Sequence, residues 1–317
     1  MPKLALIAIG GNSITDAKNG ILVKFEVLKT TIHYIVNVME MRYEIILTHG
    51  NGPQVGLILA RSDMTREFFP PVSVDFATAY TQSEIGYALQ IAFENELKRR
   101  RIKKNVATLI TKVVVDRNDP AFKNPTKPIG TFYTEEDMEE ARKSSGWIMK
   151  EDAGRGYRRV IPSPMPKEIL GLSTIKILVE KGIIVIASGG GGIPVIEEDG
   201  RYKGVEGVID KDYSSSLLAR GVSADVFLIS TATPKVYLNF GKKNEKAIDC
   251  MNIDEAEKWL KEGHFKEGSM APKIRAAISF TRDTGKATII TCPTDIESAI
   301  CGNAGTRIVW KGKREEM

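Results

Sequence analysis

The sequence predicts a doubly wound α/β fold with a mostly parallel, open sheet and a small subdomain that protrudes from it. Three apolar runs without helical spacing, at residues 4–9, 45–47 and 183–187, have the character of buried parallel strands. Stretches with helical periodicity alternate with these runs, as they do in βαβ units. The alternation is interrupted once, over residues 116–166, and this interruption predicts the subdomain.

The remaining elements continue the alternation within one predicted domain, residues 1–317. Apolar residues recur at helical spacing over 25–41, and a glycine turn ends the second strand and opens the next helix. Further helices are predicted at 77–101, 172–181, 253–262 and 270–279, with another that runs to Leu218. Further strands are predicted at 106–115, 226–230, 236–240, 287–291 and 307–310.

Residues 116–166 are rich in proline, glycine and charge, and only a short helix at 135–143 has a regular pattern. So long an irregular insertion in a compact domain is either disordered or functional. Its aromatic residues oppose disorder: Phe122, Phe132, Tyr133, Trp147 and Tyr157. We therefore expect a folded lid over the strand ends.

The composition is that of an ordinary soluble protein with a sizeable core, with 42% hydrophobic and 27% charged residues. The net charge of +5 is modest, and the densest basic run, at 98–104, closes a predicted helix, where cations favour the dipole. Because no aromatic residues interleave with this run, no nucleic-acid partner is predicted. No apolar run is long enough to span a membrane, and three cysteines without metal spacing favour a reduced, cytoplasmic setting.

The second strand stops at Gly50-Asn51-Gly52, where two glycines allow a sharp turn and a close approach to a bound group. Asn51 is expected to cap the following helix, and Pro53 suits its first turn. Free N–H groups at such a helix start can hold an anion. A single turn of this kind is as readily explained by a tight βα connection without a ligand.

Two further strands end in the same way. The first runs into Gly10-Gly11-Asn12, and the strand at 183–187 runs into Ser188 and four glycines. In open parallel sheets, ligands bind beyond the carboxyl ends of the strands, where these turns gather. Three such turns favour an enzyme that handles phosphate.

A dinucleotide-dependent dehydrogenase is a competing enzyme class, because Gly50-x-Gly-x-x-x-Gly56 loosely resembles the dinucleotide fingerprint. This alternative is weakened because no second strand ends in an acidic residue about 20 residues further on. A P-loop is not predicted, since Gly285-Lys286 is followed by Ala287 and lacks the upstream glycine.

Three lysines are candidates to neutralise a phosphoryl group during its transfer. Lys211 lies between Asp210 and Asp212 at a helix start, Lys273 lies near another helix start, and Lys127 lies in a proline-rich loop that would aim it. Each also has an ordinary explanation as a solvated surface lysine, and Asp210 as an N-capping acid.

The histidines, at positions 33, 49 and 264, lack the spacing of metal ligands. No protein-bound metal is therefore predicted. His49 directly precedes the glycine turn, where it either orients the turn or is an ordinary strand-end histidine.

Motifs in order along nearly the whole chain resemble those of carbamate kinases, a branch of the amino acid kinase family. They are Ile7-Ala-Ile-Gly-Gly-Asn12, Thr48-His-Gly-Asn-Gly-Pro-Gln-Val-Gly56, Asp119-Pro-Ala-Phe-x-Asn-Pro-Thr-Lys-Pro128, Lys150-Glu-Asp-Ala-Gly-Arg-Gly-Tyr157, Ser188-Gly-Gly-Gly-Gly-Ile-Pro194, Val208-Ile-Asp-Lys-Asp212 and Gly263-His-Phe-x-x-Gly-Ser-Met270. The resemblance implies an αβα sandwich, a homodimer, and reversible transfer of a phosphoryl group between ATP and carbamate with Mg²⁺.

The same resemblance implies roles for individual residues. The phosphoryl group in transfer would be held by Lys127, Lys211 and Lys273, with Asp212 organising the lysines. The phosphate and carbamate end would lie against Gly10, Gly11, Asn12, Gly50, Asn51 and Gly52. The nucleotide would lie against Ser188, Gly189, Gly190, Gly191, Asp210, Tyr237 and Met270, and more broadly against the region 230–237.

Four places depart from the pattern of these kinases: Ser13, Ala232, Ala271 and the stretch Ala79-Tyr-Thr-Gln-Ser-Glu84, of which the stretch matters most for the acceptor. We expect this helix segment to border the small-substrate pocket and to influence the choice of acceptor. Direct in-line transfer is favoured because no residue is an evident covalent nucleophile. The alternatives are another small-acid kinase of the family and a nucleotide sensor without catalysis, and the pathway stays open among arginine, purine and cyanate breakdown.

Overall fold

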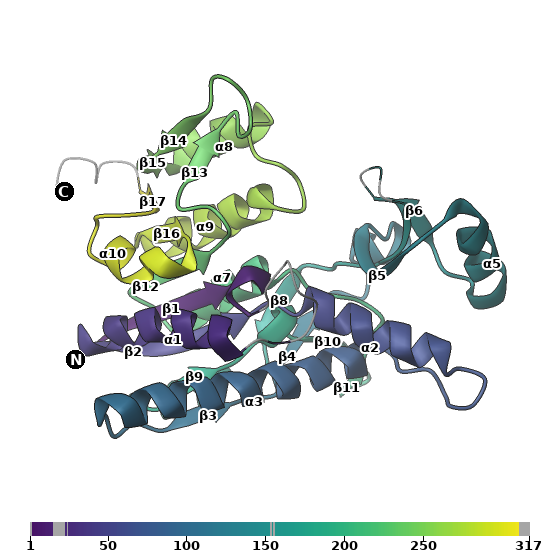
Figure 1. The fold of residues 1–317 in the computed structure, drawn as a ribbon, viewed down its shortest axis with the longest axis horizontal. Helices are drawn as coiled ribbons and strands as arrows, with labels where there is room; N and C mark the ends of the chain where they lie inside the picture. The colour runs from purple at the N-terminus through teal and green to yellow at the C-terminus, as the bar shows by residue number, and fades with distance from the viewer. Residues whose placement is uncertain (1, 15–22, 24, 153, 155, 311–317) are drawn as a thin grey trace.

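The computed structural model describes residues 2–14, 23, 25–152, 154 and 156–310. Its centre is an eight-stranded sheet in the order β15-β17-β16-β12-β1-β2-β9-β3 (Figure 1). Only β16 and β17 run antiparallel to each other, so the mostly parallel sheet predicted from the sequence is confirmed. The strands are β1 (Lys3–Ile9), β2 (Tyr43–His49), β3 (Val106–Thr108), β9 (Ile184–Ile186), β12 (Val226–Ser230), β15 (Cys250–Asn252), β16 (Thr288–Thr291) and β17 (Thr306–Val309).

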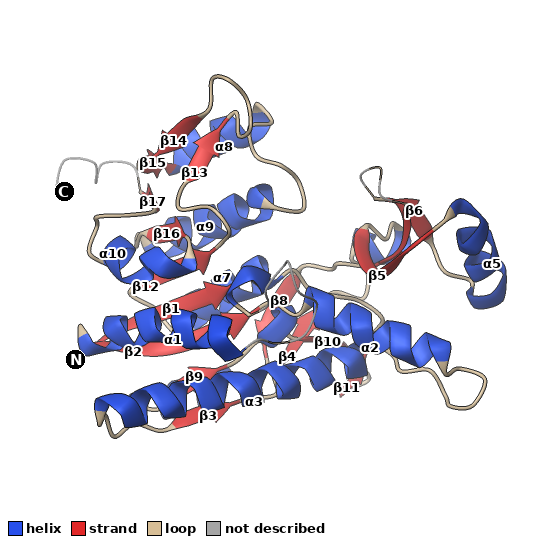
Figure 2. Ribbon diagram, in the orientation of Figure 1, coloured by secondary structure: helices blue, strands red, loops and turns tan. Residues whose placement is uncertain are grey.

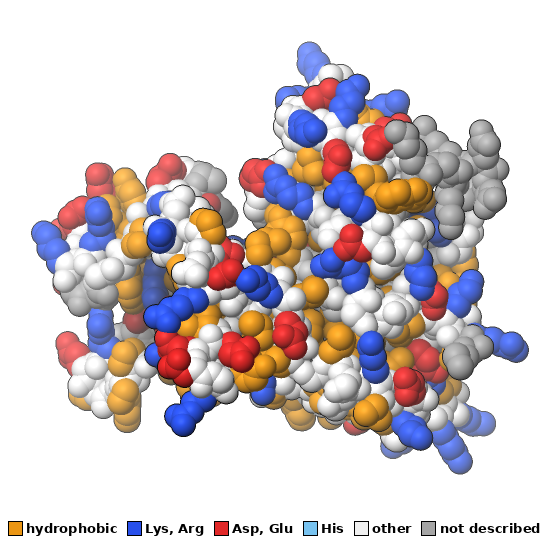
Figure 3. All heavy atoms as spheres, turned by 180° about the vertical axis from the view of Figure 1, so that it is seen from behind, with side chains coloured by type: hydrophobic (Ala, Val, Ile, Leu, Met, Phe, Trp, Pro, Cys, Tyr) orange, Lys and Arg blue, Asp and Glu red, His pale blue; other side chains and the backbone are white. Residues whose placement is uncertain are grey.

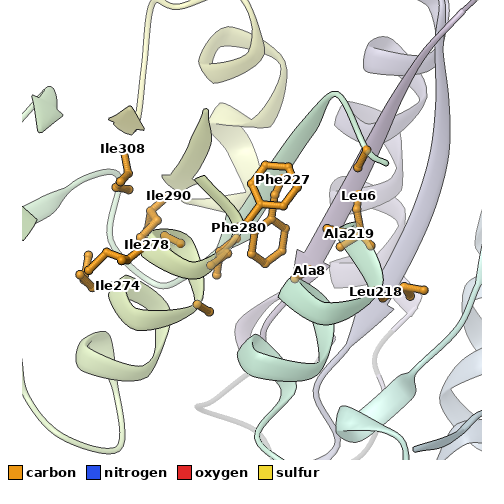
Figure 4. Close-up of a cluster of buried hydrophobic side chains, with 14 of the residues drawn as sticks. Leu6, Ala8, Leu218, Ala219, Phe227, Ile274, Ile278, Phe280, Ile290 and Ile308 are labelled. Atoms are coloured by element: carbon orange, nitrogen blue, oxygen red, sulfur yellow. The ribbon is translucent and has the colours of Figure 1, made fainter. Parts of the chain in front are cut away.

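Helices cover both faces of this sheet and make three layers (Figure 2). One face packs against α1 (Phe25–Glu40), α3 (Val74–Arg100) and α10 (Ile296–Ile300). The other packs against α6 (Leu172–Glu180), α7 (Lys211–Gly221), α8 (Ile253–Lys261) and α9 (Met270–Thr284). Successive side chains of β1 enter opposite cores, as the strand period requires. Figure 4 shows Leu6 of β1 beside Ala219 of α7.

The predicted strand at 106–115 is wrong, because the structure divides it between two sheets. β3 belongs to the central sheet, whereas β4 (Lys112–Val115) belongs to a second sheet in the order β11-β10-β4-β8. The chain leaves the first sheet at Thr111, whose backbone N–H donates to the Gln82 side chain at 2.8 Å. The apolar pattern alone cannot show this change of partner. The second sheet is completed by β8 (Pro166–Ile169), β10 (Ile193–Glu198) and β11 (Arg201–Gly204).

The described residues of the segment at 116–166 form a unit, most of which projects from the body (Figure 1). The prediction of a single regular helix is wrong: besides α5 (Glu135–Ser145), it contains α4 (Pro120–Lys123), β5 (Lys127–Tyr133), β6 (Met149–Glu151) and β7 (Tyr157–Ile161). These strands form an antiparallel sheet in the order β5-β7-β6. Two arginines make the strand pattern of β7 hard to recognise in the sequence. Their side chains pack on aromatic rings, with Arg158 over Phe132 and Arg159 over Trp147. Seen from behind, a deep notch separates this unit from the rest of the molecule (Figure 3).

Two elements complete the fold around the strand ends. α2 (Gly52–Met64) begins directly after β2, with Pro53 in its first turn as predicted. The strand predicted at 236–240 is β13 (Val236–Leu238), which pairs antiparallel with β14 (Lys246–Ile248).

The basic run at 98–104 lies at the end of α3, as the sequence predicts. Buried Glu96 accepts hydrogen bonds from the Arg99 and Arg100 side chains at 2.7 Å. These bonds hold the pKa of Glu96 down at about 2, because hydrogen bonds to the carboxylate favour its charged form against the cost of burial. α3 is 27 residues long, but neither it nor another helix in the described ranges is long and apolar enough to cross a membrane.

Gly192 joins the second sheet to the turn after β9, and we predict that Gly192→Ala destabilises the protein strongly. Its φ is +87°, and an added Cβ would collide with the Val113 side chain. Left-handed backbone and overpacking together lower the free energy of unfolding by about 2–4 kcal/mol. Gly241→Ala is the matched control, since Gly241 has φ +77° but no neighbouring atom. Equal losses in urea unfolding of the two variants would contradict this packing role.

Candidate active site

A cleft of about 360 Å³ opens at the carboxyl ends of β1, β2 and β12. It brings together most of the residues predicted to form the site: Gly10, Gly11, Gly50, Asn51, Gly52, Lys127, Gly190, Asp210, Lys211, Asp212 and Lys273. They come from the first two glycine turns, the turn after β9, the starts of α7 and α9, and β5 of the protruding unit. The site is therefore assembled from segments far apart in the sequence.

Three lysines converge on this cleft, and each is paired with a carboxylate. Asp212 lies between two of them, with Oδ1 2.9 Å from Lys211 Nζ and Oδ2 2.7 Å from Lys273 Nζ. Lys127 Nζ lies 2.8 Å from Asp210 Oδ2. Three ammonium groups against two carboxylates leave one net positive charge, so the cleft is suited to an anion.

The Asp212 carboxylate is buried, and its charge depends on the lysines. Burial alone would raise its pKa, but the positive charges of Lys211 and Lys273 outweigh this effect and hold the pKa well below its usual range. Burial lowers the pKa of Lys211, and the Asp212 carboxylate offsets only part of that lowering. An anion in the cleft would therefore stabilise the charged form of Lys211.

The start of α7 fixes the positions of Lys211 and Asp212. Asp210 is the N-cap, and its Oδ1 accepts a hydrogen bond from the Asp212 backbone N–H at 3.0 Å. The N-capping role foreseen for Asp210 is thus confirmed, whereas the surface alternative for Lys211 is wrong, because Lys211 is buried against Asp212. Ser215 of α7 shares a hydrogen bond of 2.6 Å with Thr48, which holds the helix start against β2.

In the turn after β2, the capping role predicted for the side chain of Asn51 is wrong. Asn51 is the N-cap of α2 by position, but its side chain caps no backbone N–H. Instead, Asn51 Nδ2 donates to Thr81 Oγ1 on α3 at 2.8 Å. The Gly50 backbone N–H donates to the Ile9 carbonyl at 3.0 Å, which holds the first two glycine turns side by side.

The four-glycine turn supports the turn after β2 from behind. A Cβ on Gly189 would collide with the His49 ring, and a Cβ on Gly190 would collide with the Asn51 amide. A Cβ on Gly191 would collide with the Ile209 carbonyl, just before Asp210. The absence of side chains here is thus required by packing within the protein itself, independently of any ligand.

His49 is fully buried behind the cleft, with Nδ1 3.0 Å from the Gly50 carbonyl. Burial lowers its pKa from 6.5 to about 4, so the ring is neutral at pH 7 and its Nδ1–H donates to that carbonyl. The geometry supports the interpretation of His49 as a residue that orients the turn.

Several predicted nucleotide contacts lie outside the lining of the cleft: Ser188, Gly189, Gly191, Tyr237 and Met270. Tyr237 lies on β13, where its ring is 5.7 Å from that of Phe240. The side chain of Asn12 lies outside the described part of the structure. The nucleotide roles of the first five residues, and the phosphate and carbamate role of Asn12, stay predictions.

The sequence-based residue assignments missed several cleft residues: Ser13, Val208, Ile209, Gly268 and Ser269. Ser230, Thr231 and Ala232 also line the cleft, and they belong to the region 230–237 that the resemblance implies for the nucleotide. Ser230 ends β12, which lies next to β1 in the sheet. Its place in the cleft follows the rule that ligands bind beyond the strand ends. The stretch Tyr80–Glu84 does not line the cleft, so the expectation that it borders the pocket is wrong; Tyr80 is exposed, and Thr81 contacts the cleft only through Asn51.

A model of the amino acid kinase family matches residues 3–292. The chain belongs to the amino acid kinase family. This amino acid kinase is 46% identical to a carbamate kinase of Pyrococcus horikoshii over 312 residues, which cover 97% of this chain and 99% of that protein. It is also 46% identical to a carbamate kinase-like protein of Escherichia coli, with the same coverage.

Solved structures agree with the family assignment. The structure of carbamate kinase from Giardia lamblia bound to AMP-PNP matches this amino acid kinase with a TM-score of 0.90 and 37% identity, over 98% of this chain and 99% of that one. A UMP kinase from Bacillus anthracis matches with a TM-score of 0.53 at 14% identity, which shows a common fold alone.

We predict that His49 makes this amino acid kinase sensitive to mild acid. The unfolded chain binds the His49 proton near pH 6.5 and the folded chain near pH 4, so the unfolded state gains protons first as the pH falls. This linkage removes about 2 kcal/mol of stability between pH 7 and pH 5. His49→Asn keeps a donor for the Gly50 carbonyl and cannot titrate, so its urea unfolding should lose less over this range. Parallel losses in both proteins would contradict the prediction.

Proposed function

We propose that this amino acid kinase is a carbamate kinase, which transfers a phosphoryl group reversibly between ATP and carbamate to give ADP and carbamoyl phosphate. The observation that carries the proposal is the convergence of Lys127, Lys211 and Lys273 on one cleft beside the glycine turns. The choice of acceptor is supported by relatives named carbamate kinase at 46% identity over nearly the full chain. These relatives do not favour another small-acid kinase, and a sensor without catalysis would not require the lysines.

The transfer proceeds in line, directly between the two substrates. The lysine ammonium groups neutralise the charge that spreads over the phosphoryl oxygens, and Asp212 keeps Lys211 and Lys273 together against their mutual repulsion. Charges fixed in a site with little water contribute a few kcal/mol each to the barrier reduction. The glycine turns supply backbone N–H groups for the phosphate and carbamate end.

We further propose that ATP binds with its phosphates in the cleft and its base toward Tyr237. The match to a carbamate kinase bound to AMP-PNP supports a nucleotide substrate. Ser188, the glycines that follow it, Asp210 and Met270 are the proposed nucleotide contacts on the way to Tyr237.

Mg²⁺ is proposed to bind with the nucleotide. In the described ranges, no cluster of three His, Cys, Asp or Glu side chains is placed to hold a metal. The cleft carboxylates Asp210 and Asp212 are paired with lysines, which fits an ion held mainly by substrate phosphates and water. When bound, Mg²⁺ would neutralise part of the phosphate charge.

We propose that the chain forms a homodimer through α3. Three large side chains lie exposed on α3 at near-helical spacing, namely Phe76 (58% exposed), Tyr80 (50%) and Tyr87 (64%). An apolar stripe of this kind suits a self-complementary interface with a second copy. We also propose a cytoplasmic location; Cys250, Cys292 and Cys301 are not joined by a disulfide, as is usual in a reducing compartment.

The dimer is tested by mass in solution. We predict about twice the chain mass of 35.0 kDa for the wild type and the single mass for Phe76→Glu/Tyr80→Glu, by light scattering. Phe240→Glu changes an equally exposed aromatic residue in the turn after β13; it serves as the control and should stay dimeric. A wild type of single mass would contradict the proposal.

The role of Lys127 is tested by turnover in the direction of ATP formation, from ADP and carbamoyl phosphate. We predict that Lys127→Ala lowers kcat and kcat/KM together by about 100-fold, because its charge acts mainly on the transition state. The affinity for ADP should change little. Lys123→Ala removes an exposed lysine of the same protruding unit and should turn over normally. Wild-type turnover in Lys127→Ala, or a loss confined to ADP binding, would exclude Lys127 from the reaction.

A further inference from the structure

A buried hydrogen-bond chain connects α3 to the cleft. Thr81 is fully buried, and its Oγ1 donates to the Thr78 carbonyl at 2.8 Å. The same Oγ1 lies 2.8 Å from Asn51 Nδ2. A hydroxyl has one proton, and that of Thr81 is committed to Thr78. Thr81 therefore only accepts from Asn51, and this fixes which end of the Asn51 amide faces α3.

The fixed orientation leaves Asn51 Oδ1 as the remaining polar atom of a side chain that lines the cleft. An N-cap asparagine ordinarily uses this oxygen to cap its helix, but Asn51 makes no such bond to α2. Over the described ranges, no donor to Asn51 Oδ1 is found. Gly190 packs against the amide from behind, so the side chain has no room to move back.

We propose that Asn51 Oδ1 accepts a hydrogen bond from the amino group of the carbamoyl substrate, and that Thr81 is the positioning residue that keeps this oxygen turned toward it. The inference rests on the proposed function and deepens it. Carbamoyl phosphate and acetyl phosphate have nearly the same shape, but one presents –NH₂ where the other presents –CH₃. A fixed acceptor therefore distinguishes the two, and a reversed amide would instead set its own donors against –NH₂.

The neighbouring carboxylate and carbonyl oxygens cannot accept from the amino group as readily. The carboxylates of Asp210 and Asp212 are paired with Lys127, Lys211 and Lys273. The Ile9 carbonyl, at the end of β1, already accepts from the Gly50 N–H. Asn51 combines a position on the cleft with an uncommitted acceptor, which is what a selective contact to an amino group requires.

The test compares two acyl phosphates with ADP as the acceptor. In each case the bond from phosphorus to the acyl oxygen breaks and a bond to the terminal ADP oxygen forms, which releases carbamate or acetate. The quantity measured is the ratio of kcat/KM for carbamoyl phosphate to that for acetyl phosphate. We expect the wild type to favour carbamoyl phosphate.

Thr81→Val removes the acceptor for Asn51 Nδ2 with little change of shape, so the amide is free to reverse. The ratio should fall about tenfold, through a higher KM for carbamoyl phosphate, while the kinetics with acetyl phosphate and the KM for ADP stay near wild type. Thr81→Ser keeps the hydroxyl and should restore the ratio. Thr78→Val is the matched control, because it removes a buried hydroxyl one turn earlier whose bond goes only to the Val74 carbonyl.

The outcomes are distinguishable. A wild type that forms ATP from carbamoyl phosphate, with an unchanged ratio in Thr81→Val, overturns this inference alone, as does an equal fall in Thr78→Val. A wild type without preference between the two acyl phosphates also overturns it. A wild type that forms ATP from neither overturns the proposed function as well. If Thr81→Val does not fold, Asn51→Ala answers the question, since loss of the acceptor must also reduce the ratio.

Discussion

The site depends on one buried carboxylate, that of Asp212, between the ammonium groups of Lys211 and Lys273. Two ammonium groups held together away from water repel each other strongly unless a negative charge lies between them. Asp212 provides that charge, and the start of α7 fixes its position through the Asp210 cap. With Lys127 added from the protruding unit, the group keeps an excess of positive charge. An arrangement that would be costly in a purely structural core is suited to receive a phosphoryl group.

The glycine turns contribute to the site of Asp212 and the three lysines in two different ways. Gly50 brings the turns after β1 and β2 into contact, so that their backbone lies at the cleft. The glycines after Ser188 act from behind, where Gly189 and Gly190 make room for His49 and Asn51. The same sequence feature thus brings backbone to the cleft in one turn and meets a packing requirement in the other. The position of the Asn51 amide follows from both.

Much of the fold could be predicted, because buried strands and amphipathic helices leave periodic patterns and strand ends gather at one sheet edge. The lysines were recognisable as candidates, but their grouping followed from the family resemblance, since Lys127 and Asp210 lie 83 residues apart. The division of 106–115 depends on the Gln82 side chain, which no local pattern encodes. The role of Thr81 was likewise hidden, because a threonine inside a helix has no signal until its partner, Asn51, is known.

We propose that Lys127, Lys211 and Lys273 surround the phosphoryl group during its transfer. A crystal structure of the protein with ADP, Mg²⁺, carbamate and tetrafluoroaluminate, a planar mimic of that group, tests it most directly. We expect the mimic to lie within hydrogen-bond distance of the ammonium groups of all three lysines, with Asp212 still between Lys211 and Lys273. A mimic bound elsewhere, or bound in the cleft without contact to Lys127 and Lys211, would contradict it.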